Sequence, residues 1–307
     1  MSFTIKGLGL PYLGSKRKIA KDLLDFMLAK NPNACYFYDL FGGGGAVTFE
    51  AISRDEIKEV VYNEKNKAVV ELLKDILENG VRKEYYNWID RKTFHENKTK
   101  DNYFAGLCQL VWSFGNDQTS YIYSKEKERL NYLKHRVVVN DDKDALNKLN
   151  KLLNLILKLP TSNEKDFKKQ IEEKRLKFMS NVKNRGLLRL RHLESINLLV
   201  KIDEVKDLIN EKIKILNHSY EEVKFTTPKD KTIIYMDPPY KNTKIYRYDI
   251  NHKELLEYIK TLTSKGYKIY VSSYEFEGLR CVYEKKHKSI ICATNNNKRV
   301  VEKLFSL

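Results

Sequence analysis

Residues 36–47 read Tyr-Phe-Tyr-Asp-Leu-Phe-Gly-Gly-Gly-Gly-Ala-Val, and this stretch decides the fold that the sequence predicts. Its first half, 36–41, is aromatic or apolar apart from Asp39, as is typical of a buried strand. The glycines let the backbone approach a ligand closely where the strand turns into a helix that should end near Ile52. A dinucleotide-binding fingerprint fits poorly, because consecutive glycines leave no spacer side chains. The candidate residues of this turn form a spaced set instead: Asp39, Phe41, Gly43 and Gly45.

The next predicted strand, residues 60–63, ends at Glu64. An acid that follows a Gly-rich turn by roughly 20–25 positions is placed to accept hydrogen bonds from ribose hydroxyls. The alternative is a solvent-facing glutamate before the helix expected at 65–78. The Gly-rich turn upstream favours the first interpretation.

The N-terminal loop carries a ring and a cation ahead of a helix predicted at about 16–29. Residues 9–16 nearly match a phosphate-binding P-loop, but the lysine comes one position late and no strand precedes the glycines. We therefore reject a P-loop and keep Tyr12 and Lys16 as the informative residues of this loop.

Asp237-Pro238-Pro239-Tyr240 follows a third apolar strand at 232–236, so it lies where ligands bind in an open α/β sheet. The prolines fix φ and donate no hydrogen bond, which makes the loop stiff and leaves its carbonyls as acceptors. The Asp237 carboxylate and the Pro238 carbonyl can together hold an amino group, and the Tyr240 ring can stack on a flat base. The alternative is an ordinary turn after a strand, since Asp and Pro are turn formers.

Between these two halves, residues 79–214 change in character, because glycine thins out and Lys-rich helical segments take over. Helices are expected at 142–159 and 163–180, broken near Pro160. Within 101–124, aromatic residues interleave with amides and hydroxyls, and lysines follow, which suits base-edge and phosphate contacts. An aromatic core with a polar loop is the alternative. The candidate contacts are Trp112, Asn116, Gln118, Tyr121 and Lys125.

Sheet character returns after residue 213, with further strands expected at 214–217 and 267–273 and a helix at 251–265. A terminal β-hairpin should follow at 280–286 and 299–305. Strands that alternate with helices indicate an α/β fold with helices on both faces of the sheet. We therefore predict one domain from 1–78 and 215–307, with a mostly helical insertion at 79–214.

Charge and cysteine usage narrow the class of protein. The 307 residues carry a net charge of +16 and a pI of about 9.4, which favours a polyanionic partner, with nucleic acid first. A solvated basic surface is the alternative, since the charge is spread along the chain. The four cysteines and six histidines show no metal-ligand spacing, so we expect reduced thiols and no metal site. Without a signal peptide or a long apolar run, we expect a cytoplasmic protein that does not bind membranes.

Taken in chain order, these motifs resemble those of the Dam-type DNA adenine methyltransferases, which use S-adenosylmethionine. The resemblance implies a Rossmann-like methyltransferase sheet, with 79–214 as the inserted target-recognition domain. It implies catalysis by the motif Asp237, Pro238, Pro239 and Tyr240. It implies cofactor binding by residues from all four motifs: Tyr12, Lys16, Asp39, Phe41, Gly43, Gly45, Glu64 and Asp237.

The activity that this resemblance implies is methyl transfer to the 6-amino group of adenine in duplex DNA, after the base is flipped out. Tyr246 is a second stacking candidate, although it could equally be a core residue. One departure concerns Ser219, which stands where the family usually has an acid expected to meet the cofactor's adenine. The aspartate at position 237 favours adenine over cytosine, because relatives that act on the cytosine amine more often carry serine there.

Two other classes of function remain open from the sequence. The first is a related methyltransferase that acts on the cytosine amine, on RNA or on protein. The second is a catalytically silent DNA-binding regulator with the same fold, against which the intact acidic and Gly-rich motifs argue. We expect a monomer, with duplex DNA as partner and a cognate restriction endonuclease as a candidate partner.

Overall fold

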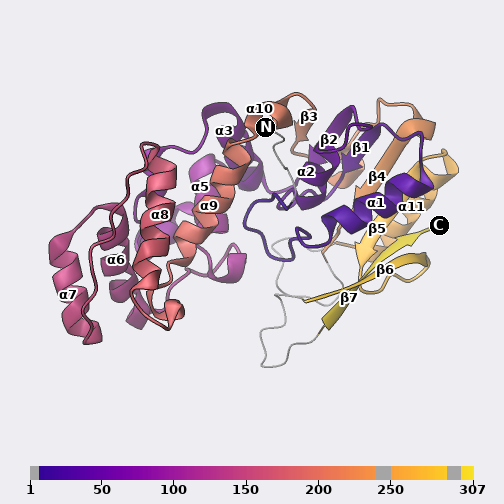
Figure 1. Ribbon diagram of the computed structural model, residues 1–307. Coiled ribbons are helices and arrows are strands. Elements are labelled where there is room, and N and C mark those ends of the chain that lie inside the picture. The colour runs from indigo at the N-terminus through magenta and orange to yellow at the C-terminus, as the bar shows by residue number, and fades with distance from the viewer. Residues whose placement is uncertain (1–6, 240–249, 289–298) are drawn as a thin grey trace.

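The computed structural model describes residues 7–239, 250–288 and 299–307, and its centre is a mixed β-sheet (Figure 1). Across these ranges the sheet has seven strands in the order β3-β2-β1-β4-β5-β7-β6. The strands are β1 (Tyr36–Asp39), β2 (Glu59–Asn63), β3 (Ile213–Leu216), β4 (Thr232–Met236), β5 (Lys268–Ser273), β6 (Arg280–Lys288) and β7 (Arg299–Ser306).

The first five strands run parallel, and the last two form the antiparallel hairpin that the sequence predicts. β7 pairs antiparallel with β5, with Val271 opposite Phe305, so the hairpin extends the edge of the parallel sheet. Each strand from β1 to β5 lies within two residues of its predicted position.

Helices cover both faces of the sheet. Successive strand residues point to opposite sides, so each strand contributes side chains to a core on each face. On one face, Phe37 packs in the same core as Leu23 of α1 (Ala20–Lys30). On the other face, Tyr38 packs in a second core with Ile259 of α11 (His252–Ser264). The predicted α/β fold, with helices on both faces, is confirmed.

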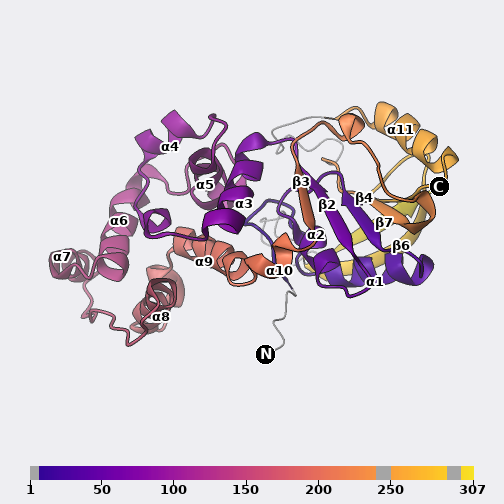
Figure 2. The same ribbon diagram turned by 90° about the horizontal axis from the view of Figure 1, so that it is seen from above.

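The remaining α-helices form in segments with an apolar stripe, and several begin at an Asn or Asp whose side chain accepts a backbone N–H. They are α2 (Ala46–Ile52), α3 (Lys67–Asn79), α4 (Arg91–Asn97), α5 (Tyr103–Val111), α6 (Lys125–Val139), α7 (Lys143–Leu153), α8 (Phe167–Ser180), α9 (Arg191–Asp203) and α10 (Lys206–Asn210). Helices α4 to α9 gather beside the sheet, as the view from above shows (Figure 2). Among the described residues, no helix has the length and apolar character needed to cross a membrane.

The sequence prediction overestimates the length of the two helices around Pro160. α7 ends at Leu153, because Asn154 takes a left-handed conformation with φ 51° and stops the helix. The Asn150 side chain then accepts a hydrogen bond from the Leu157 amide at 2.8 Å. The break therefore begins before the proline, and α8 starts only at Phe167.

Candidate active site

Three acidic residues meet at the carboxyl edge of the sheet because their strands are neighbours. β1 lies between β2 and β4, and Asp39 at its end is in register with Tyr62 and Tyr235. Glu64 directly follows β2, and Asp237 directly follows β4. Ligands of open α/β sheets bind at this edge, where strand order switches.

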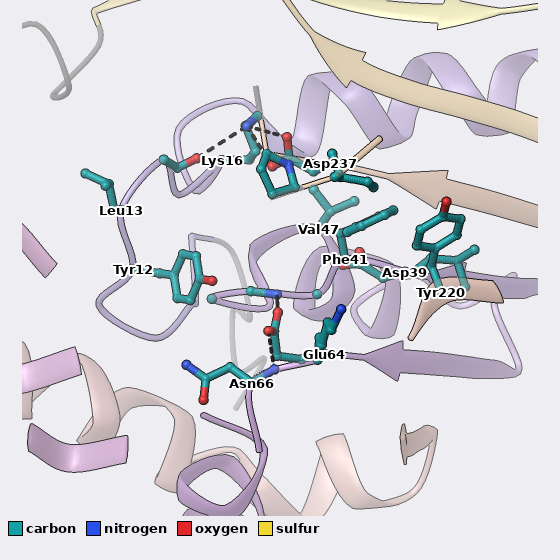
Figure 3. A pocket seen from close by; sticks show the side chains of 18 of the residues that line it. Tyr12, Leu13, Lys16, Asp39, Phe41, Val47, Glu64, Asn66, Tyr220 and Asp237 are labelled. Carbon is teal, nitrogen blue, oxygen red and sulfur yellow. Dashed lines mark hydrogen bonds and ion pairs between the residues drawn. The ribbon is translucent and has the colours of Figure 1, made fainter. Parts of the chain in front are cut away.

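A pocket of about 250 Å³ opens at this edge (Figure 3). Its walls come from the N-terminal loop, the Gly-rich turn, the segment after β2, the insertion, residues 218–221 and the start of α11. Most of the predicted site residues that the structure describes line it: Tyr12, Lys16, Asp39, Phe41, Gly43, Glu64, Asn116, Gln118, Asp237 and Pro239.

Two hydrogen bonds between the Gly43 backbone and side chains hold the Gly-rich turn against β2 and the residue that follows it. The Gly43 amide donates to Glu64 Oε2 at 2.8 Å, and the Tyr62 hydroxyl donates to the Gly43 carbonyl at 2.7 Å. A side chain at Gly42 would overlap the Tyr62 ring, so only glycine allows this close approach. Gly45 is not among the residues that line the pocket, and it is the N-cap of α2, with φ 71°. Its predicted contact with the cofactor stays a prediction.

Glu64 is buried, so the alternative of a solvent-facing glutamate is wrong. Its Oε1 accepts a hydrogen bond from the Asn66 amide at 2.7 Å. Burial raises the pKa of the Glu64 carboxyl, while the backbone amides of Asn66 and Gly43 oppose that shift. The result is a fixed acceptor on the pocket wall.

Asp39 is a second buried acid, and it has one satisfied oxygen. Thr48 Oγ1 donates to Asp39 Oδ2 at 2.7 Å. Oδ1 is buried near the Phe41 amide without a well-formed hydrogen bond to any residue that the structure describes. Burial raises the pKa of Asp39 to about 7, and the negative charges of Asp237 and Glu64 add to this effect.

Asp237 is held by a lysine from the N-terminal loop, far away in the sequence. Lys16 Nζ donates to Asp237 Oδ1 at 2.9 Å and to Oδ2 at 2.7 Å. Burial alone would lower the pKa of Lys16, but the carboxylates of Asp237 and Glu302 outweigh it and raise that pKa. The sequence predicts Lys16 as a cofactor contact, and the structure shows that it also pairs with Asp237.

The rest of the Asp-Pro-Pro-Tyr motif is described only in part. Pro238 is buried, and the Pro239 carbonyl lies 3.1 Å from His252 Nε2, which ties the loop to α11. Tyr240 and Tyr246 lie outside the described residues, so their predicted stacking is not addressed.

The segment after β3 supplies an acid that the sequence analysis missed. Ser219 caps a short 3-10 helix, and its backbone amide donates a hydrogen bond to Glu222 Oε2 at 2.9 Å. Glu221 lines the pocket two positions beyond the serine and contacts its hydroxyl. The signal available in the sequence was the Ser-x-x-Glu capping pattern of Ser219 and Glu222, which indicates a helix start with Glu221 in its first turn. Beside it, the Tyr220 and Phe41 rings lie 5.3 Å apart.

The predicted contacts of the insertion divide into two groups. Asn116 and Gln118 reach the pocket, with positive φ values of 62° and 65°. Gln118 Oε1 accepts a hydrogen bond from Asn66 Nδ2 at 2.9 Å, which joins the insertion to the segment after β2. Lys125 is exposed at the start of α6.

Trp112 and Tyr121 are core residues, which corrects their prediction as base contacts. They are 0% and 5% exposed, and their rings stack 6.4 Å apart in an aromatic core. The Tyr121 hydroxyl donates to the Ile89 carbonyl at 2.7 Å. The alternative of an aromatic core with a polar loop therefore holds for these two rings.

A Rossmann-like sheet with a Gly-rich turn and three acids at its carboxyl edge is consistent with the fold of the methyltransferase class. The chain matches the model of the D12 class N6 adenine-specific DNA methyltransferases over residues 12–296. Because the match covers most of the sequence, the protein belongs to this family and is an adenine-specific DNA methyltransferase.

No curated protein matches the chain. Among solved structures, a candidate methylase, HI0767, from Haemophilus influenzae is similar to it at 13% sequence identity and a TM-score of 0.29. The comparison covers 96% of this chain and 90% of that one.

Proposed function

We propose that the protein transfers a methyl group from S-adenosylmethionine to the 6-amino group of adenine in duplex DNA, with the base flipped into the pocket. The observation that carries this proposal is the position of Asp237. Its carboxylate stands on a stiff proline loop at the rim of the pocket that Glu64, Asp39 and the Gly-rich turn form. An acid so placed can hold an exocyclic amine next to a cofactor.

The pocket residues fit S-adenosylmethionine. Glu64 suits the ribose hydroxyls, because carboxylates accept strongly from hydroxyl donors. The unsatisfied Oδ1 of Asp39 is a further acceptor close to the Gly-rich turn. The Phe41 and Tyr220 rings, with Glu221 nearby, suit a flat heterocycle and its amine. When bound, the cofactor supplies an electrophilic methyl group on a sulfonium.

Asp237 and Pro238 activate the substrate amine in this proposal. The lone pair of the adenine 6-amino group is delocalised into the ring, so the amine is a weak nucleophile. Hydrogen bonds from that amine to the carboxylate and to the proline carbonyl would localise the lone pair on nitrogen. They would also stabilise the positive charge that develops there during transfer. We keep Tyr240 and Tyr246 as proposed stacking residues.

The insertion at 79–214 is the proposed target-recognition element. The net charge of the whole chain, +16, supports phosphate binding, since lysines and arginines release counterions from DNA. Lys125 is exposed and suits a phosphate, whereas Asn116 and Gln118 lie at the pocket and suit a flipped nucleotide. We also propose a cytoplasmic location, a monomeric state and a cognate restriction endonuclease as a partner.

Expression in a host that lacks DNA methylation tests the proposal, with modification-aware sequencing of the host DNA. We expect N6-methyladenine at one recurring sequence with the wild type and none with Asp237→Ala. Methylated cytosine would favour the cytosine-amine alternative. If the DNA is unmodified, RNA and protein should be tested as substrates. Unmodified DNA that the protein nevertheless binds tightly would favour the silent regulator.

A further inference from the structure

The terminal hairpin contributes a buried carboxylate to the edge of the active site. Glu302, on β7, is 1% exposed, and its Oε1 lies 3.8 Å from Lys16 Nζ. Ser272, on the neighbouring strand β5, donates its hydroxyl to the same Oε1 at 2.8 Å. The serine therefore orients the oxygen that faces the lysine.

Lys16 lies between two carboxylates as a result. Asp237 is its nearer partner, at 2.9 and 2.7 Å, and Glu302 is the more distant one. The exposed fractions of the Lys16, Asp237 and Glu302 side chains are 6%, 21% and 2%. The site is poorly solvated and holds one positive charge between two acids. When the ammonium moves closer to one carboxylate, its attraction to the other becomes weaker.

The proposed reaction adds a second donor to Asp237. Its carboxylate accepts two hydrogen bonds from Lys16 in the structure, and the substrate amine would compete with the ammonium for the same two oxygens. If the ammonium gave up Asp237 and gained nothing in return, a buried charge would lose its nearest partner, which is unfavourable. Glu302 is already within ion-pair distance of the same nitrogen.

The geometry points to Glu302 as a positioning residue that receives the Lys16 ammonium when Asp237 turns to the substrate amine. This inference rests on the proposed function, since the exchange frees the proposed catalytic carboxylate. It makes the terminal hairpin part of the active site. Ser272 then has the role of keeping Glu302 aimed at the lysine.

Glu302→Gln tests the inference, because it preserves the size of the side chain and removes its charge. Single-turnover methyl transfer with saturating cofactor and duplex DNA should slow by roughly 10–100-fold, as expected for misplaced reacting groups. The dissociation constant for S-adenosylmethionine should stay within about twofold of wild type, because the Glu64 wall is untouched. Glu302→Asp keeps the carboxylate and should recover part of the rate.

Glu284→Gln is the matched control, since it removes the same charge from the same hairpin at a side chain that is 56% exposed. Its rate should equal that of the wild type. A wild-type rate in Glu302→Gln would overturn the inference. Equal losses in the Gln and Asp variants would also overturn it, because they would indicate packing rather than charge.

If Glu302→Gln does not fold, Ser272→Ala supplies the test, because it leaves all three charges in place and removes the hydrogen bond to Oε1. It should slow the same single-turnover step, and an unchanged rate would overturn the inference. A wild-type protein that methylates no adenine would overturn the proposed function itself, and the inference with it. The two failures are therefore distinguishable.

Discussion

Lys16 and Asp237, which are 221 positions apart in the sequence, form an ion pair in which one ammonium contacts both carboxylate oxygens. The pair joins the N-terminal loop to the motif after β4. The segments that precede and follow residues 79–214 therefore meet at the proposed active site. It also means that the proposed catalytic carboxylate is charged and oriented before a substrate arrives.

Asp237→Asn should reduce methyl transfer while the fold is kept. The amide has the shape of the carboxylate but not its charge, so the developing positive charge on the amine loses its main stabilisation. We expect the single-turnover rate to fall by roughly 10²–10³-fold or more. Circular dichroism serves as the control for folding. Wild-type turnover in this variant would remove Asp237 from the mechanism.

Lys16→Met should destabilise the protein, because it leaves Asp237 and Glu302 close together without their shared cation. Removing one partner of a buried ion pair is costly, and Asp237 is partly solvated, so we expect a loss of about 2–3 kcal/mol in the free energy of unfolding. Urea denaturation measures it. Lys21→Met breaks an exposed pair with Asp25 and should cost less than about 0.5 kcal/mol. Equal losses in both variants would contradict the importance of burial.

The main effect of Glu64→Gln should be weaker binding of the cofactor. Replacing a charged acceptor by a neutral one costs about 1.5–3 kcal/mol, or roughly 10–100-fold in the dissociation constant for S-adenosylmethionine. Isothermal titration calorimetry gives that constant directly. Glu71→Gln, at a partly exposed residue of α3, is the matched control. An unchanged constant for Glu64→Gln would show that this acid does not contact the cofactor.

Asp39 should make stability depend on pH. Its pKa is about 7 in the folded protein, against an ordinary value of 3.8, so the folded state binds more protons between these values. The free energy of unfolding therefore falls as pH rises from about 4 to 7, by a total on the order of 4 kcal/mol. Asp39→Asn removes this term, so the variant should gain stability relative to wild type as pH rises.

Urea denaturation of the ligand-free proteins at pH 5 and pH 8 checks this expectation. The difference between variant and wild type should grow in favour of the variant at the higher pH. A difference that does not change with pH would mean that the Asp39 pKa is not raised in the fold.

Much of the sheet could be predicted because local patterns carry it. The apolar run at 232–236 and the acid after it give a buried strand and its functional end without any knowledge of the partner strands. The same holds for the Gly-rich turn, whose consecutive glycines require a close backbone approach. These elements depend on residues that are close together in the sequence, so one sequence is enough to predict them.

The contacts that depend on distant segments could not be predicted. Nothing local pairs Lys16 with Asp237, since the contact exists only after β1 and β4 have become neighbours. Trp112 and Tyr121 were misassigned because an aromatic ring beside amides is equally compatible with a core and a binding surface. Their burial is decided by the helices that pack around them, including His192 of α9, whose ring lies 4.3 Å from that of Trp112.

Nucleoside analysis of duplex DNA, after incubation with the purified protein and isotope-labelled S-adenosylmethionine, tests the central claim most directly. The account predicts that the label appears only as N6-methyladenine, and that it is absent when Asp237 is replaced by Asn. Label on cytosine, or equal labelling of adenine by the wild type and the variant, would contradict it.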